Sequence, residues 1–315
     1  MISRLRNLLP ARERLQAGNP LLHYELGRPA GGNFALQLTA LILLLGTAAA
    51  IYAVAFGVSD GGNLSARLWQ SMYFPALALQ MITLMLALGL GAASVDGERS
   101  RKTWDKLRAT ETGASLALRA RWLGIMYRLR APISIILLLR LLLALGTLLD
   151  LTAFGGHYVK MLSAETTPAL SDWRVGLLLI ALSLTLSLAQ PLAMIASAAA
   201  LGLLLSVAVV ERLYSAVLQV MLAAMFAAFI LAASAGVTGI LQGRLIMSDA
   251  AQYLLVLAYS SYGDWGLLLA QVSAVWRGAP AGAFIGPGMA ALLLLQALIA
   301  DGLMALAERV SERRG

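Results

Sequence analysis

Cysteine is absent from the 315 residues, which excludes disulfide bonds and thiolate metal sites. Charge is scarce, because only 13% of the residues are Asp, Glu, Lys or Arg, about half the share of a soluble domain. Histidine occurs only at His23 and His157, and the topology argued below separates them across a membrane, which excludes a haem or zinc site built from the pair. The sequence also lacks the G-x-x-x-x-G-K-[ST], H-E-x-x-H and G-x-S-x-G motifs, so we expect no enzyme activity and no cofactor in this chain.

What the chain does contain is apolar sequence, with 60% hydrophobic residues and a mean hydropathy of +0.79. This composition predicts an all-α polytopic membrane protein, since spans of ~20 apolar residues recur along it. We expect six transmembrane helices, at about 34–57, 69–95, 131–154, 175–210, 213–240 and 284–306. The long run 175–210 is interpreted as one tilted or Pro191-broken span with an interfacial or irregular outer end. The first 20 residues lack the apolar core of a cleaved signal and are expected to stay attached.

Basic residues indicate the orientation of these spans. Of the 24 Lys and Arg residues, five lie in residues 1–33, nine in 96–130, three in 308–315 and one at Arg212, against five on the opposite side. This positive-inside bias predicts that both termini and the 96–130 loop are cytoplasmic. It also accounts for the net charge of +8 without a nucleic-acid partner. The domains are then a cytoplasmic N-terminus (1–33), a transmembrane domain (34–307) and a cytoplasmic tail (308–315).

The stretch 241–283, between the fifth and sixth spans, is apolar but uneven. It is rich in Tyr and Trp, which favour the headgroup zone, and it contains Gly and Pro. We expect external, re-entrant short helices here, although two further full spans would preserve the same orientation.

A few polar residues interrupt the apolar runs: Gln80, Arg140, Asp150, Gln190, Gln296 and Asp301. A charge inside a membrane is costly and therefore marks a candidate functional site, here Arg140 with Gln80 and Gln190. The alternatives for Arg140 are that it snorkels, pairs with a carboxylate or contacts a lipid phosphate. The glutamines can equally form interhelical hydrogen bonds.

The segment NPLLHYELGRP, residues 19–29, precedes the first span. Its apolar side chains can form one surface, with polar residues between them, which is typical of a short interfacial elbow helix. The elbow residues are Leu21, Leu22, Tyr24, Leu26 and Arg28. An ordinary linker is the alternative.

The segment DGERSRKTWDKLRAT, residues 96–110, is the densest run of charge in the chain. Gly97 ends the preceding helix, Thr103 can cap a new one, and Trp104 and Leu107 then share a face. A small apolar centre with a charged rim favours docking to a soluble partner, and the alternative is a solvated loop.

The two segments resemble the ABC type-2 permeases, the exporter-type membrane subunits of ATP-driven transporters. Residues 98–110 match that family's E-x-x-x-x-T-x-[DE]-x-L-x-[AS]-T loop after the second span, and NPLLHYELGR matches its asparagine-proline elbow ending in E-L-x-R. The match departs from the pattern at Lys102, where glycine is usual, and at Glu111-Thr112, where Pro-leucine is common.

The resemblance implies a permease subunit in a prokaryotic plasma membrane, paired with a second identical or related permease and with ATPase subunits that bind ATP and Mg²⁺. Its coupling helix, docked on the ATPase, would comprise Glu98, Arg101, Lys102, Thr103, Trp104, Asp105, Lys106 and Leu107. The cargo would be hydrophobic or amphipathic. A non-transporting anchor or accessory subunit is the alternative from another class, and a lipid-modifying enzyme is a third hypothesis.

Overall fold

The computed structural model describes residues 64–95, 113–152, 157–166, 168–209, 211–245 and 247–313. These residues are almost entirely helical, and no strand occurs among them. Five of the described helices are long and apolar enough to cross a membrane: α4 (Leu64–Ala92), α8 (Arg130–Thr152), α10 (Trp173–Ala208), α11 (Arg212–Leu241) and α14 (Ile285–Arg313). They overlap the predicted spans after the first, with ends that differ by at most seven residues. The predicted first span, 34–57, lies outside the described residues.

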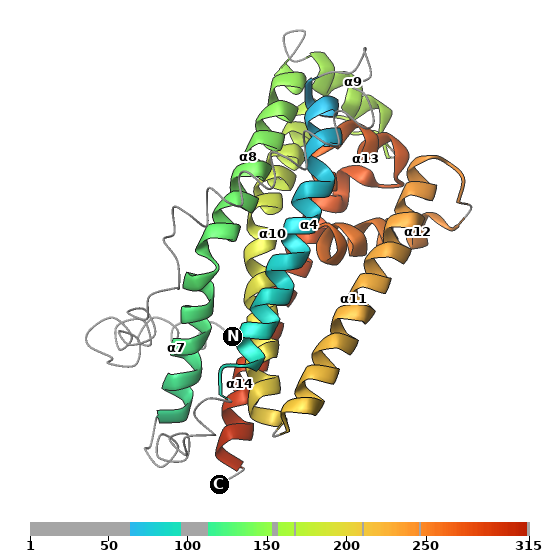
Figure 1. The fold of residues 1–315 in the computed structure, drawn as a ribbon. Coiled ribbons are helices and arrows are strands. Elements are labelled where there is room, and N and C mark those ends of the chain that lie inside the picture. The colour runs from blue at the N-terminus through green and yellow to red at the C-terminus, as the bar shows by residue number, and fades with distance from the viewer. Residues whose placement is uncertain are drawn as a thin grey trace.

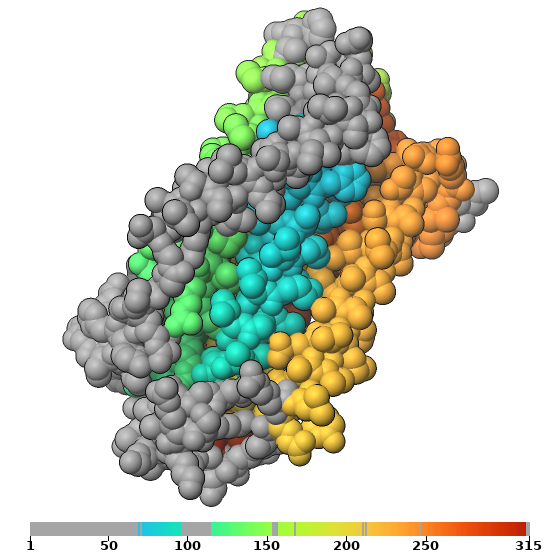
Figure 2. All heavy atoms as spheres, viewed as in Figure 1, coloured from blue at the N-terminus to red at the C-terminus, as the bar shows by residue number. Residues whose placement is uncertain are grey.

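The five long helices run lengthwise through the molecule, with α10 packed against α14, α4 and α8 (Figure 1). One end, the lower in Figure 1, holds the end of α4, the α10–α11 connection and the C-terminus. The short helix α9 (His157–Glu165) and the start of α10 lie at the other end. Figure 2 shows α4 and α11 lengthwise on one face of the molecule.

Much of the predicted 96–130 loop is helical, because α7 (Gly113–Arg128) continues almost directly into α8. The N–H of Leu129 bonds the Ile125 carbonyl at 3.0 Å, and the N–H of Ile133 bonds the Leu129 carbonyl at 3.0 Å. Residues 113–152 therefore form a rod of about 60 Å, twice the thickness of the hydrocarbon layer. Charge alone was a poor guide here, because the arginines of α7 alternate with buried apolar residues such as Leu118 and Ile125.

The rod is attached to the bundle by side chains of α7. The indole Nε1 of Trp122 donates to the carbonyl of Ala196 on α10 at 3.0 Å. Arg119 forms an ion pair with Glu308 of α14 at 2.8 Å. These contacts link α7 directly to α10 and α14.

Of the two readings of 175–210, the Pro-broken one with an irregular outer end is corrected, since α10 is one helix of 36 residues with Pro191 inside it. That this single span is tilted stays a prediction. Proline is tolerated in membrane helices when another group satisfies the carbonyl that it leaves unpaired. The donor at Pro191 comes from a neighbouring helix, as described below.

The small residues at the end of α4 allow a close helix crossing. A Cβ on Gly91 would lie 2.8 Å from the Ala199 carbonyl oxygen and 2.9 Å from the Cα of Gly202. A Cβ on Gly202 would lie 2.4 Å from the Leu88 carbonyl oxygen. Backbones of α4 and α10 thus touch near the end where the charged 96–112 segment begins.

The stretch between α11 and α14 consists of short elements: α12 (Asp249–Ala258), a π-helix (Tyr259–Gly263), a 3₁₀ turn (Leu268–Ala270), α13 (Val272–Gly278) and a second 3₁₀ turn (Gly282–Phe284). Each has ten residues or fewer, so none of the helices described between 247 and 284 has the length of a span. Many of their side chains are buried against α10, α11 and α14. This packing brings the π-helix and the turn after it into the centre of the bundle.

Candidate functional site

Arg140 lies near the middle of α8 and is only 2% exposed. Along the helix it is about 15 Å from Arg130 at one end and about 18 Å from Thr152 at the other. Its guanidinium is enclosed by protein, so it neither snorkels nor contacts a lipid phosphate. An arginine at this depth is stable only where its N–H groups have acceptors.

The acceptors are main-chain carbonyls from two distant segments. Nη1 donates to the carbonyls of Ser187 on α10 and, at 2.7 Å, of Trp265. Nη2 donates to the carbonyl of Asp264 at 3.1 Å. Arg140 therefore joins α8 to α10 and to the turn after the π-helix through main-chain oxygens.

The carbonyl of Ser187 is available because of Pro191. In a regular helix the N–H of residue 191 would bond the carbonyl of residue 187, and proline has no N–H. Arg140 provides the missing donor from α8. The same contact gives the arginine an acceptor and lets α10 continue through its proline.

The turn at 264–266 has an uncommon backbone conformation. Trp265 and Gly266 have φ values of 58° and 88°, and the left-handed region costs a residue with a Cβ about 1–3 kcal/mol. The Asp264 carboxylate holds the turn by accepting from the N–H of Gly266 at 3.0 Å and of Leu268 at 2.7 Å. Glycine suits position 266 because a residue with a Cβ rarely adopts a φ of 88°, and a Cβ there would also lie 3.2 Å from the Cα of Ser187.

Gln80 of α4 completes the surroundings of Arg140. In the amide orientation that its neighbours require, its oxygen accepts from Nη2 of Arg140 at 2.6 Å and from Nε at 3.3 Å. Its nitrogen donates to the carbonyl of Asp264 at 3.2 Å. Gln80 and Arg140, both predicted as candidate site residues, thus bond each other and the main chain of the same turn.

The third predicted residue, Gln190, lies one turn along α10 from Ser187. Its Nε2 donates to the Ser261 carbonyl in the π-helix at 2.7 Å and to Oε1 of Gln296 on α14 at 2.8 Å. At the opposite end of the π-helix, the hydroxyls of Tyr73 and Tyr259 are 2.6 Å apart. We call this set the polar layer: Tyr73, Gln80, Arg140, Gln190, Tyr259, Asp264 and Gln296.

One atom of the polar layer and three polar groups in the segment next to it have no hydrogen-bond partner among the described residues. Gln190 Oε1, the hydroxyls of Ser260 and Ser261 and the indole N–H of Trp265 are buried and unpaired within the described part of the chain. Such groups are rare in folded proteins and are costly in an apolar environment. The unpaired oxygens of Gln190 and Ser261 flank the contact with Gln296.

Sequence reasoning identified the residues that reach toward the turn but missed the turn itself. Asp264 is fully buried, and its only sequence signal is Y-G-D-W-G, an Asp two residues before a Gly, which is typical of a side-chain-capped turn. The other two carboxylates noted in the spans do not join the layer. Asp150 is partly buried near the end of α8, and Asp301 is exposed on α14.

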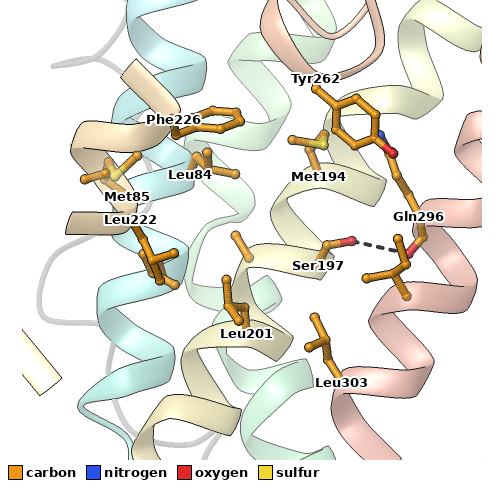
Figure 3. A pocket seen from close by; sticks show the side chains of 14 residues that line it. Leu84, Met85, Met194, Ser197, Leu201, Leu222, Phe226, Tyr262, Gln296 and Leu303 are labelled. Carbon is orange, nitrogen blue, oxygen red and sulfur yellow. Dashed lines mark hydrogen bonds between the residues drawn. The ribbon is translucent and has the colours of Figure 1, made fainter. Parts of the chain in front are cut away.

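A pocket of about 250 Å³ lies beside the polar layer, between α4, α10, α11 and α14. Its walls are almost entirely hydrocarbon, and Tyr262, Gln296 and Ser197 supply its polar atoms (Figure 3). The described residues that line it are Leu84, Met85, Leu88, Met194, Ser197, Ala198, Leu201, Leu222, Ala223, Phe226, Tyr262, Gln296, Ile299 and Leu303.

The predicted coupling helix, Glu98 to Leu107, and the predicted elbow, Leu21 to Arg28, lie outside the described residues. Among the side chains that are described, no three His, Asp or Glu residues gather as metal ligands. Comparison with known proteins found no matching family model, no matching curated protein and no matching solved structure.

Proposed function

We propose that the chain is the membrane-spanning permease subunit of an ABC type-2 transporter that moves a hydrophobic or amphipathic cargo. A separate ATPase subunit would bind ATP and Mg²⁺ and dock on residues 98–107, and a second permease copy or a related chain would complete the complex. The basis for the family is the resemblance of the 98–110 and 19–28 segments.

The observation that carries the proposal is how the charged segment connects to the polar layer. The helix before it, α4, holds Gln80, and the rod after it, α7–α8, holds Arg140. These two side chains bind each other and the same turn at 264–265. A partner that pushed the 96–112 segment would therefore displace both helices and, through them, the turn in the middle of the bundle.

We also propose six crossings with both termini on the cytoplasmic side. The five described long helices alternate in direction, so one further crossing at 34–57 would place both termini at the same end. The short elements between 249 and 284 then form a re-entrant region on the external side. Their burial against the spans supports this topology, because non-helical backbone at membrane depth is tolerated only inside protein.

The cysteine-free chain allows a direct test by cross-linking. Trp104→Cys in native membranes is labelled with a short reagent that is thiol-reactive at one end and photoreactive at the other. We expect capture of a protein with a G-x-x-x-x-G-K-[ST] loop, and ATP hydrolysis by the purified complex. The control is Met161→Cys on α9, which is 57% exposed at the opposite end and should capture no ATPase.

Capture of lipid alone, or of nothing, by a labelled and correctly inserted Trp104→Cys chain would contradict the proposal. So would capture of a partner that lacks the phosphate-binding loop. Either result would favour the non-transporting accessory subunit.

A further inference from the structure

We propose that the pocket between α4, α10, α11 and α14 binds an uncharged amphiphile, whose hydroxyl-bearing head meets the polar layer and whose hydrocarbon chain lies along α11. That this ligand is the transported cargo rests on the transport function proposed above. Its binding to the pocket does not, because binding requires no ATPase.

The hydrocarbon part follows from the walls of the pocket. Leu84 and Leu88 of α4, Leu201 of α10 and Phe226 of α11 line it at the depth of the spans. A space at this depth is surrounded by lipid chains rather than water, so an apolar chain is its natural occupant.

One wall of the pocket is a loosely packed helix. Only 11% of the apolar window of α11 is buried, and neighbouring residues such as Val220 and Met225 are 69% and 66% exposed. The packing of α11 is concentrated on the π-helix and α12, with fewer contacts to α4 and α13. A hydrocarbon chain from the bilayer can therefore enter beside α11 without breaking a packed interface.

The polar atoms on the side of the pocket next to the polar layer determine which head group fits. Tyr262, Gln296 and Ser197 line the pocket (Figure 3), and none of the described lining residues is Asp, Glu, Lys, Arg or His. A phosphate or carboxylate there would lose its hydration without gaining a counter-charge. The lining thus selects against ionised heads.

The head must also donate a hydrogen bond. Gln296 uses Oε1 to accept from Gln190, and its Nε2 reaches the Ser261 carbonyl only at 3.4 Å. Directly behind it, Oε1 of Gln190 is an acceptor with no donor, and the hydroxyl of Ser261 is unpaired within the described residues. A hydroxyl offers both a donor and an acceptor. Gln190 and Ser261 are fully buried and do not themselves line the pocket, so the proposal includes a shift of Gln296 that lets the hydroxyl reach them.

The position of the pocket suits such a ligand. From Gln296 to Leu303 the pocket follows α14 for about 10 Å, away from the polar layer and toward the end that carries the C-terminus. The head would thus lie near mid-depth, next to the turn that Arg140 holds, with the chain beside α11. The ligand site adjoins the turn at 264–266, so ligand binding and the conformation of the turn can influence each other.

The test uses the purified full chain in phosphatidylcholine nanodiscs and three probes with the same diazirine-bearing acyl chain: a monoacylglycerol, a fatty acid at pH 8 and a lysophosphatidylcholine. We expect the monoacylglycerol to label peptides containing 84–88, 194–201, 222–226 and 296–303. Its labelling should exceed that of the charged probes by about tenfold, the value of one or two buried hydrogen bonds.

The matched variants are Ala223→Trp, which fills the pocket, and Ala224→Trp, which adds the same bulk to the exposed side of α11. Only the first should abolish the preferred labelling. Gln296→Leu should retain labelling and lose the preference for the hydroxyl head.

Equal labelling by the three probes would show that the pocket holds bilayer hydrocarbon without selection, and labelling that survives Ala223→Trp would place the ligand elsewhere. Either result overturns this inference. Neither affects capture of an ATPase by Trp104→Cys, so the two proposals fail separately.

Discussion

Two consecutive spans of nearly equal hydropathy have opposite environments. The windows of α10 and α11 have mean hydropathies of 2.0 and 2.4, yet 61% of the α10 window is buried and only 11% of the α11 window. Lipid is as apolar as leucine, so apolar side chains alone do not drive helices together in a membrane. What distinguishes α10 is its set of polar and small residues that meet other elements. Pro191 frees the carbonyl of Ser187 for Arg140, Gln190 bonds the π-helix, and Gly202 lets the backbone of α4 come close.

The comparison predicts that a few polar contacts hold α10 to its partner helices. Arg140→Leu should therefore have the largest effect on the free energy of unfolding. It leaves the carbonyls of Ser187 and Trp265 buried without their donor and removes one of the donors to the Asp264 carbonyl, which keeps Gln80. We expect a loss of about 3–5 kcal/mol in the free energy of unfolding in detergent, as when one partner of a buried charged network is removed. Thermal or denaturant unfolding of the purified chain measures it.

A single cysteine makes the same variant informative about the turn. Ser261 is fully buried, so a cysteine placed there by Ser261→Cys should be protected from thiol reagents as long as Arg140 is present. With Arg140→Leu it should become labelled, because the turn is released. Leu141→Ala, at a neighbouring site that is 46% exposed, is the control and should leave protection intact. Unchanged protection in Arg140→Leu would mean that apolar packing alone holds the turn.

The next largest effect concerns close approach of backbones, tested by Gly202→Ala on α10 and Gly236→Ala on α11. A Cβ at 202 meets the Leu88 carbonyl oxygen at 2.4 Å, whereas a Cβ at 236 meets only the mobile end of Leu255, at 2.7 Å. We expect Gly202→Ala to lower the free energy of unfolding by about 1–3 kcal/mol, as overpacking does. Gly236→Ala should be neutral or slightly stabilising, because alanine favours the helix by about 0.5–1 kcal/mol. Equal effects in denaturation curves would contradict the comparison.

A smaller effect is expected for Asp264→Asn, which keeps one acceptor for the two N–H groups of Gly266 and Leu268. Losing one capping bond should cost about 0.5–2 kcal/mol. The control is Asp249→Asn in the exposed first turn of α12, where no comparable change is expected. The Ser261→Cys protection assay reports whether the turn loosens, and a stable, fully protected Asp264→Asn chain would show that Arg140 is sufficient.

Hydropathy was enough to locate the long helices, because a span is recognised by the length of its apolar run. The predicted 131–154 and 213–240 correspond to α8 (130–152) and α11 (212–241). Hydropathy could not distinguish a packed span from a loosely packed one. Nor could it find α7, whose arginines placed it in the predicted cytoplasmic loop 96–130 although its apolar residues pack on α10 and α14.

The polar layer was only half visible in the sequence. Arg140, Gln80 and Gln190 were recognisable because polar side chains in apolar runs are costly and need partners. The acceptors of Arg140 are three main-chain oxygens, 47, 124 and 125 positions away, and carbonyls carry no sequence signal of their own. Pro191 was the available signal for one of them, since a proline always frees the carbonyl four residues before it.

The smallest expected effect is that of Leu231→Ala on the open side of α11. Leu231 is 72% exposed, so in a single chain its loss exchanges leucine–lipid contact for alanine–lipid contact and should change the free energy of unfolding by less than about 0.5 kcal/mol. The matched change Leu203→Ala on α10, at a fully buried site, should cost more because it leaves a cavity. Unfolding and oligomeric state are measured together in nanodiscs. If Leu231→Ala instead dissociates a dimer or costs as much as Leu203→Ala, a second copy of the chain covers the outer face of α11. In that case α10 packs within its own chain, whereas α11 packs against another chain.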